Sequence, residues 1–222
     1  MINDFENSLI ENIDNQNDKE KEIISFLLSN GISAEKSKMI TEKLYYKFYN
    51  LYNIVNASKN ELIKIKGLGN KRADLLKSLP KILEYYLLSR LKLSTLHFNK
   101  KDLIDYLIIK FGKLKFEAFS IICLDINKRF ISIEQIFRGT IDSATIYPSD
   151  LVEKSLSLGA SYVIISHNHP SGISKPSKED IEITKILYKA FLIVNIKMID
   201  HLIIAGDSIY SFRESGILDD FN

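Results

Sequence analysis

Residues 166–180 read Ser-His-Asn-His-Pro-Ser-Gly-Ile-Ser-Lys-Pro-Ser-Lys-Glu-Asp. The stretch places His167 and His169 two residues apart and Asp180 at its end. Two imidazoles and one carboxylate form a three-ligand set that can hold zinc and leave a fourth position open for water. An open position distinguishes a catalytic zinc site from a closed structural one. The stretch therefore predicts a metal ion that is used for chemistry.

The neighbouring residues predict how these side chains are held. Residues 162–165 are an apolar run rich in β-branched side chains, which is typical of a buried strand. Residues two apart on an extended chain point to the same side, so both imidazoles can face one ion. The prolines and glycine of residues 170–176 indicate a loop. Ser177 then begins a helix, with Asp180 in its first turn.

Ser177 and Asp180 also have a simpler interpretation. Ser177-Lys178-Glu179-Asp180 resembles a capping box, with Asp in place of the usual Glu or Gln. On their own these two residues are typical of a helix cap, and a His-x-His pair also arises by chance. The joint spacing of both histidines with a downstream carboxylate favours the metal site.

The whole pattern, His-x-His, seven residues and Ser-x-x-Asp, resembles the JAMM motif of the JAB/MPN metalloprotease superfamily. The surrounding His-Asn-His-Pro-Ser-Gly and Pro-Ser-x-x-Asp resemble the bacterial RadC family in particular, across roughly residues 100–220. Further pairs carry the same resemblance: Leu124-Asp125, Gly139-Thr140, Tyr147-Pro148 and Asp200-His201. Ser149 departs from the family pattern, which has a basic residue after Tyr-Pro. This departure would affect substrate contacts and leave the metal ligands unchanged.

The resemblance implies a fold and an activity. The fold is a JAB/MPN-like (cytidine-deaminase-like) α/β sandwich with a mixed sheet over residues 100–222, preceded by a small all-helical domain. The activity is zinc-dependent hydrolysis of a peptide or isopeptide bond in a protein or peptide substrate. One zinc ion per chain would be held by His167, His169 and Asp180.

A zinc hydrolase also needs a base, because a carboxylate must take the proton of the attacking water and deliver it to the leaving group. The family pattern has a glutamate near the start of the first strand. Glu117 fits this place, and Glu134 is the alternative; either could instead be a solvated carboxylate at a strand edge. Ser177 would cap its helix and also hydrogen-bond the oxyanion that forms when water attacks a carbonyl. His201 is expected to support the ligands or to pack in the core.

The C-terminal half is predicted to alternate strands and helices. Strands are expected over 116–124, 129–138, 162–165, 194–200, 201–205 and 208–212, and helices over 150–158 and 177–191.

The N-terminal half is different in character. Residues 1–19 are polar, and residues 20–97 have helical periodicity. Residues 63–76 resemble a helix-hairpin-helix DNA-binding motif: Gly67 and Gly69 allow a tight turn, and backbone N–H groups at the next helix start can bind a phosphate. Lys71 and Arg72 would add charge and hold DNA non-specifically. The alternative is a helical hairpin used only for packing or docking.

Composition limits the remaining classes of protein. Cys123 is the single cysteine, which excludes an internal disulfide and fits a reducing cytoplasm. No apolar run approaches the ~18 residues of a membrane span, and the first residues lack the pattern of a signal peptide. Residues 1–30 carry seven acidic and two basic side chains, whereas residues 61–92 carry eight basic and three acidic ones.

The sequence therefore favours a cytoplasmic zinc hydrolase of JAMM type with a helical domain that contacts DNA. The rival interpretation is a DNA-associated binding module whose metal site is structural or vestigial. Metal-dependent nucleic-acid hydrolysis ranks below both, because phosphodiester cleavage often uses paired metals and the predicted ligands suffice for one ion.

Overall fold

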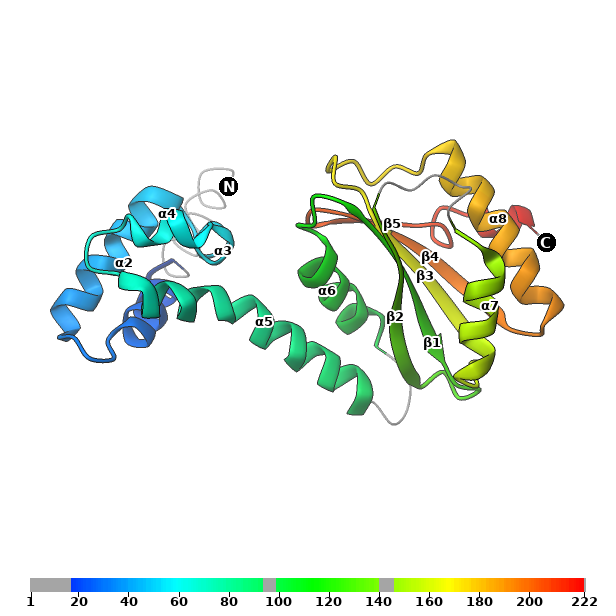
Figure 1. Ribbon diagram of the computed structural model, residues 1–222, viewed down its shortest axis with the longest axis horizontal. Coiled ribbons are helices and arrows are strands. Elements are labelled where there is room, and N and C mark those ends of the chain that lie inside the picture. Colours follow the sequence, from blue (N-terminus) through cyan, green and yellow to red (C-terminus); the bar gives the residue numbers. More distant parts are fainter. Residues whose placement is uncertain (1–16, 94–98, 140–145, 222) are drawn as a thin grey trace, which may run out of the picture. The chain divides into compact units, whose positions relative to one another are not determined.

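The computed structural model describes residues 17–93, 99–139 and 146–221 (Figure 1). The chain divides into two compact units, Met1–Ile82 and Leu83–Asn222, and the division falls within the long helix α5 (Gly69–Leu93). The domain boundary predicted at residues 97–100 lies largely in residues 94–98, outside the described ranges, as does most of the polar segment 1–19. Within those ranges no helix is both long and apolar enough to cross a membrane.

The first unit consists of short helices. Residues 17–28 form the first, followed by α2 (Ala34–Phe48), α3 (Leu51–Asn56), α4 (Lys59–Ile63) and the first half of α5. Their apolar side chains meet in one core: Ile24, Leu28, Ile40, Leu44, Ile54, Leu62, Leu68 and Leu76. The capping box at the start of α4 is present, with both bonds between Ser58 and Glu61. The six residues of α3 are too few to show a periodicity, and the sequence does not predict that helix.

The predicted helix–turn–helix over residues 63–76 is present. Gly67 and Gly69 have φ of 96° and 68°, which glycine adopts readily and other residues rarely do. Leu68, between them, is fully buried. A Cβ at Gly67 would lie 3.3 Å from Cδ1 of Ile40. The turn is therefore fixed both by backbone conformation and by close packing on α2.

The second unit is built on a mixed five-stranded sheet in the order β2-β1-β3-β4-β5. The strands are β1 (Glu117–Leu124), β2 (Phe130–Gly139), β3 (Tyr162–Asn168), β4 (Lys197–Ala205) and β5 (Ser208–Ser211). β3 and β4 are parallel, and the other neighbouring pairs are antiparallel. The predicted mixed sheet is thus confirmed.

Helices cover both faces of this sheet (Figure 1). α7 (Pro148–Ser157) and α8 (Lys178–Ile193) lie on one face, and α6 (Lys100–Phe111) lies on the other. Alternate residues of β1 point to opposite cores: Ile121 and Cys123 contribute to the core with α7 and α8, and Ile122 and Leu124 to the core with α6. A short 3-10 helix, η2 (Ile217–Phe221), ends the described chain. Burial of both faces explains the continuous apolar runs in the sequence and confirms the α/β sandwich.

The prediction of two strands over 194–200 and 201–205 is wrong, because β4 is continuous. The polar residues Asp200 and His201 are typical of the end of a strand. In the structure, however, they are only 4% and 0% exposed. The Asp200 carboxylate accepts hydrogen bonds from the Ser211 hydroxyl at 2.7 Å and the Arg213 backbone N–H at 3.0 Å. Polar residues remain inside a strand when each finds partners.

The Asp200 carboxylate is expected to stabilise the second unit. Asp200→Ala removes the acceptor of the Ser211 hydroxyl and of the Arg213 N–H, so the free energy of unfolding should fall by about 2–3 kcal/mol. Glu214→Ala is the matched control. Glu214 pairs with Lys100, the lysine that also contacts Asp200, but the Glu214 side chain is 71% exposed. The control should cost at most about 0.5 kcal/mol in urea unfolding. Equal losses in both variants would contradict this role.

Candidate metal centre

The side chains of His167, His169 and Asp180 converge at the end of β3. Nε2 of His167 lies 3.0 Å from Nε2 of His169 and 3.0 Å from Oδ1 of Asp180. Nε2 of His169 lies 3.3 Å from Oδ2 of Asp180. Each of the three residues offers one ligand atom, and these atoms lie within 4.8 Å of one another. The structure thus brings together all three predicted metal ligands.

These distances fit a single metal ion. Nitrogen and oxygen ligands bind zinc at about 2.0–2.2 Å, and tetrahedral geometry then separates neighbouring ligand atoms by about 3.3–3.6 Å. Of the three separations among the two imidazoles and the Asp180 carboxylate, one is 3.3 Å and two are slightly shorter, at 3.0 Å. The cluster is therefore positioned to bind a metal ion with small side-chain adjustments.

Strand pairing and the following loop position the two histidines. His167 lies within β3, opposite Phe119 of β1, whose ring stacks on the imidazole at a centroid distance of 5.9 Å. The His169 N–H donates to the carbonyl of Ile204 at 2.8 Å, which continues the contact of β3 with β4. Nδ1 of His169 lies 2.8 Å from the carbonyl of Ile173 in the loop that leads to α8. That contact leaves Nε2 of His169 facing the cluster.

The helix cap positions the carboxylate. Ser177 is the N-cap of α8, and the capping box with Asp180 is complete. The Ser177 backbone N–H and hydroxyl donate to Oδ2 of Asp180 at 2.7 and 2.6 Å, while the Asp180 N–H donates to the Ser177 hydroxyl at 3.0 Å. The cap thereby holds Oδ2, which also lies near His169, and Oδ1 faces His167. The capping and metal-binding interpretations of these residues are compatible.

The cluster sets the protonation of its own members. Burial alone would raise the pKa of the Asp180 carboxyl, but hydrogen bonds with His167 and His169 outweigh burial and hold that pKa well below its usual range. The hydrogen bond to Asp180 raises the pKa of His169. Asp180 is therefore ionised at neutral pH, which is the form that binds a metal.

Two buried residues, His201 and Thr184, lie behind the His167 ring, and only His201 is anticipated by the sequence. Nε2 of His201 in β4 lies 2.7 Å from Nδ1 of His167. Nδ1 of His201 lies 2.6 Å from the hydroxyl oxygen of Thr184 in α8, and that hydroxyl donates to the carbonyl of Asp180. His201 and Thr184 are both fully buried, and burial lowers the pKa of His201 well below its usual value, so this ring is neutral.

These contacts would have one consistent direction once a metal ion is bound. His167 would then offer a free lone pair on Nε2 to the metal, and its hydrogen would lie on Nδ1 and be donated to His201. The hydrogen of His201 would lie on Nδ1 and be donated to Thr184, whose own hydrogen goes to the Asp180 carbonyl. Such partners fix the tautomer and orientation of a ligating imidazole. His201 thus supports a ligand, as the sequence predicts, whereas Thr184 has no local signal in the sequence.

Glu117 lies at the start of β1, beside the end of β3. It is half-buried, and its charge contributes to the raised pKa of His169. Asn168, between the two histidines, fixes the backbone on both sides of Glu117: its side chain accepts from the Ala118 N–H at 2.8 Å and donates to the Phe116 carbonyl at 3.0 Å. The middle residue of the His-x-His pattern therefore positions the predicted base.

Two other candidate groups lie elsewhere. Glu134 lies opposite Ile121 in the middle of the β1–β2 ladder and pairs with Lys154 of α7 at 3.4 Å. Cys123 is fully buried, and burial raises the pKa of its thiol to about 11, so it is no nucleophile at neutral pH.

The predicted DNA contacts belong to the first unit. Lys71 is exposed, but the guanidinium of Arg72 donates to the carbonyls of Leu28 and Asn30 at 2.8 and 2.7 Å. Arg72 therefore ties α5 to the end of the first helix, a role that the sequence does not reveal.

The mixed sheet, its covering helices and the His-His-Asp cluster are those expected of a JAB-type protein. Residues 98–217 match the family of RadC-like JAB domains. A UPF0758 protein of Methylibium petroleiphilum is 32% identical over 197 residues, which is 89% of this chain and 89% of that protein. A UPF0758 protein of Pseudoalteromonas translucida is 33% identical over 197 residues, 89% of this chain and 88% of that protein. The chain belongs to the RadC family, as the sequence motifs predict.

The Thr184 hydroxyl is expected to strengthen metal binding without touching the metal. Thr184→Val leaves the His201 N–H without an acceptor and frees the His167 ring to turn, so metal affinity should fall by about 10-fold to 100-fold. Thr184→Ser should retain the affinity. Ser155→Ala controls for the loss of a buried helix hydroxyl, because Ser155 donates to the Leu151 carbonyl in α7. The metal affinity is measured by competition with a chelator. If Thr184→Val binds the metal as tightly as the wild type, the hydrogen bonds from Thr184 through His201 do not support His167.

Proposed function

We propose that this protein is a zinc-dependent hydrolase of JAMM type that cleaves a peptide or isopeptide bond. The observation that carries the proposal is the convergence of His167, His169 and Asp180 with the separations of a three-ligand metal site. Three protein ligands leave the fourth position open, as in catalytic sites. The single buried cysteine fits the proposed location in the reducing cytoplasm.

The donor set favours zinc over magnesium and calcium. Magnesium and calcium prefer sites made of oxygen ligands, whereas imidazole nitrogen combined with a carboxylate suits zinc. Zinc in such a site supplies a Lewis acid and lowers the pKa of water towards neutrality. One ion per chain fits the single cluster found in the described residues.

Glu117 is proposed as the general base. Its carboxylate would accept a proton from the attacking water while the water oxygen bonds to the substrate carbonyl carbon. As the carbon–nitrogen bond breaks, Glu117 would deliver that proton to the departing amine. Asn168 would keep the carboxylate in place through the flanking backbone. The mid-strand position of Glu134 and its ion pair with Lys154 make it the weaker candidate.

Ser177 is proposed to stabilise the oxyanion as the substrate carbonyl is attacked. Its hydroxyl hydrogen is directed at Asp180, so the hydroxyl would have to rotate towards the substrate. The Ser177 N–H would still hold Oδ2 of Asp180 during that rotation. Transition-state donors of this kind typically contribute about 100-fold or more to the rate.

The proposal separates the base from the ligands. Glu117→Gln should retain about one zinc per chain but lose hydrolysis by about 100-fold to 10,000-fold, because the amide cannot accept the proton. His167→Ala should lose both zinc and activity, since a ligand is removed. Elemental analysis measures the metal, and peptides or conjugates captured by the Glu117→Gln form supply substrates for the rate assay.

Glu134→Gln is the matched control and should keep both zinc and activity. Full turnover by Glu117→Gln would place the base elsewhere. Equal zinc in wild type and His167→Ala would remove the metal assignment. Zinc binding with no turnover on any captured protein would favour the rival interpretation, a DNA-associated module with a structural metal site.

The first unit is proposed to bind duplex DNA non-specifically through the turn at Gly67 and Gly69. Support comes from the positive φ of both glycines and from the exposed Lys71. Backbone N–H groups at the start of α5 would contact a phosphate, and Lys71 would add its charge. Arg72 would contribute indirectly, by holding the helix in place.

Removing the Lys71 charge tests this contact. Lys71→Ala should weaken duplex binding by the full-length protein and reduce the magnitude of its salt slope by about 1, because one fewer counterion is released. Lys36→Ala, at an exposed position of α2, is the control and should leave the slope unchanged. Binding that does not depend on salt would restrict this hairpin to packing.

A further inference from the structure

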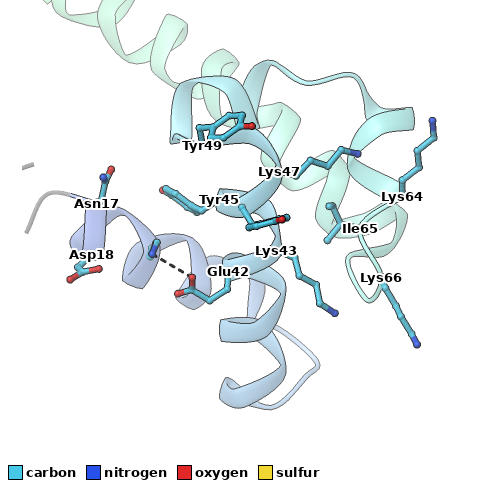
Figure 2. A pocket seen from close by; sticks show the side chains of 12 residues that line it. Asn17, Asp18, Glu42, Lys43, Tyr45, Lys47, Tyr49, Lys64, Ile65 and Lys66 are labelled. Carbon is cyan, nitrogen blue, oxygen red and sulfur yellow. Dashed lines mark ion pairs between the residues drawn. The ribbon is translucent and has the colours of Figure 1, made fainter. Parts of the chain in front are cut away.

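A broad groove lies on the first unit, and its lining ends at Lys66, next to the glycine turn (Figure 2). It has a volume of about 1110 Å³ and lies between the start of the first helix, α2 and the segment that follows α4. Twelve side chains line it: Asn17, Asp18, Lys21, Glu42, Lys43, Tyr45, Tyr46, Lys47, Tyr49, Lys64, Ile65 and Lys66. Ile65 is the only aliphatic residue among these described lining residues. Small-molecule pockets span about 300–1,000 Å³, so this groove suits a ligand at or above that size.

The charge of the groove is positive. Among the described residues, its lining has five lysines and two carboxylates, and Glu42 pairs with Lys21 at 3.4 Å. Lys43, Lys64 and Lys66 have no carboxylate within ion-pairing distance in the described residues. Figure 2 shows Lys64 and Lys66 extending from the segment after α4, across the groove from Asp18. One side of the groove is therefore a cationic edge.

Exposed aromatic rings add a second property. Tyr46 and Tyr49 at the end of α2 are 87% and 78% exposed, whereas Tyr45 is buried and bonds to Glu20. Tyr49 also adopts a φ of 73° with a ψ of −37°, a conformation that tyrosine rarely adopts and that glycine would take more readily. The chain thus keeps an exposed ring at a position where the backbone favours another residue. This points to a use for the ring outside the core.

We propose that this groove binds single-stranded nucleic acid. The lysines contact successive phosphates, and the rings of Tyr46 and Tyr49 stack on unpaired bases. A cationic groove with exposed aromatic rings is the general design of surfaces that bind single strands without sequence preference. An acidic peptide would satisfy the lysines but would leave both exposed rings unused. The site goes beyond the proposed hydrolase and the duplex contact, because it needs neither the metal nor the Gly67–Gly69 turn.

The rings are tested first, with the full-length protein and a labelled oligothymidine. Tyr46→Ala should reduce affinity by about 5-fold to 100-fold, which is the range for loss of one stacked base. Tyr46→Phe keeps the aromatic face and should bind like the wild type. Tyr49→Gly removes the other ring, and glycine tolerates the φ of 73° and ψ of −37°, so its loss of affinity cannot be attributed to backbone strain. Phe26→Ala is the control, because Phe26 is 78% exposed on the same unit and lies outside the groove.

The lysines are tested by the salt dependence of the same binding. Lys43→Gln and Lys66→Gln should each reduce the magnitude of the salt slope by about 0.7, the value per phosphate for a single strand. Lys36→Gln, outside the groove, should leave the slope unchanged. Lys71→Ala should weaken duplex binding more than single-strand binding, which separates this groove from the proposed hairpin contact.

The outcomes decide between occupants. Loss of binding in the tyrosine variants, with Tyr46→Phe and Phe26→Ala unaffected, supports the stacking site. If the affinity for oligothymidine is unchanged in both tyrosine variants, the proposed stacking site is wrong. Displacement of the strand by polyglutamate, together with indifference to the rings, would instead assign the groove to acidic peptides. Failure of the zinc or hydrolysis experiments leaves this result standing, because strand binding is measured without turnover.

Discussion

The contact between His167 and Asp180 joins the sheet of the second unit to helix α8, and the arrangement of the site depends on it. Nε2 of His167 and Oδ1 of Asp180 are 3.0 Å apart, and both side chains are almost fully buried. Burying a polar or charged group is unfavourable unless it is paired. The imidazole therefore requires the carboxylate on one side and His201 on the other. Since these partners come from three different elements, the pairing fixes β3, β4 and α8 together.

The strand order explains how one site collects residues from distant parts of the sequence. β1 runs antiparallel to β3, so the start of β1, with Glu117, lies beside the end of β3, with the histidines. β4 runs parallel to β3 and places His201 opposite Ile165. From there, Nε2 of His201 reaches Nδ1 of His167. Open sheets with parallel strands commonly bind ligands beyond the carboxyl ends of those strands. Asn168 then links the two strand ends, which couples the predicted base to the ligand loop.

The sequence predicts the features that are local. The metal ligands lie within one strand end, one loop and one helix start, so their spacing alone identifies them. The caps at Ser58 and Ser177 follow from short motifs. Thr184 is different, because its partner His201 lies 17 residues away, and Asn168 bonds to Ala118 across 50 residues. No local pattern signals such bonds, and the predicted end of a strand at Asp200 is wrong for the same reason.

Three described residues other than glycine have a positive φ: Tyr49, Lys128 and Asn195. Such a conformation is informative when the surrounding structure does not explain it. Asn195 has a positive φ at a helix end, and asparagine tolerates this conformation. Lys128 also has a positive φ, but it lies in the hairpin turn between β1 and β2, where positive φ angles are usual. Tyr49 ends a helix with a positive φ, a ψ of −37° and a bulky exposed ring, so neither explanation applies. Functional sites are where folded chains tolerate such conflicts. The same reasoning distinguishes the two sites: buried imidazoles require a fully paired network, whereas a stacking surface requires rings that remain exposed to solvent.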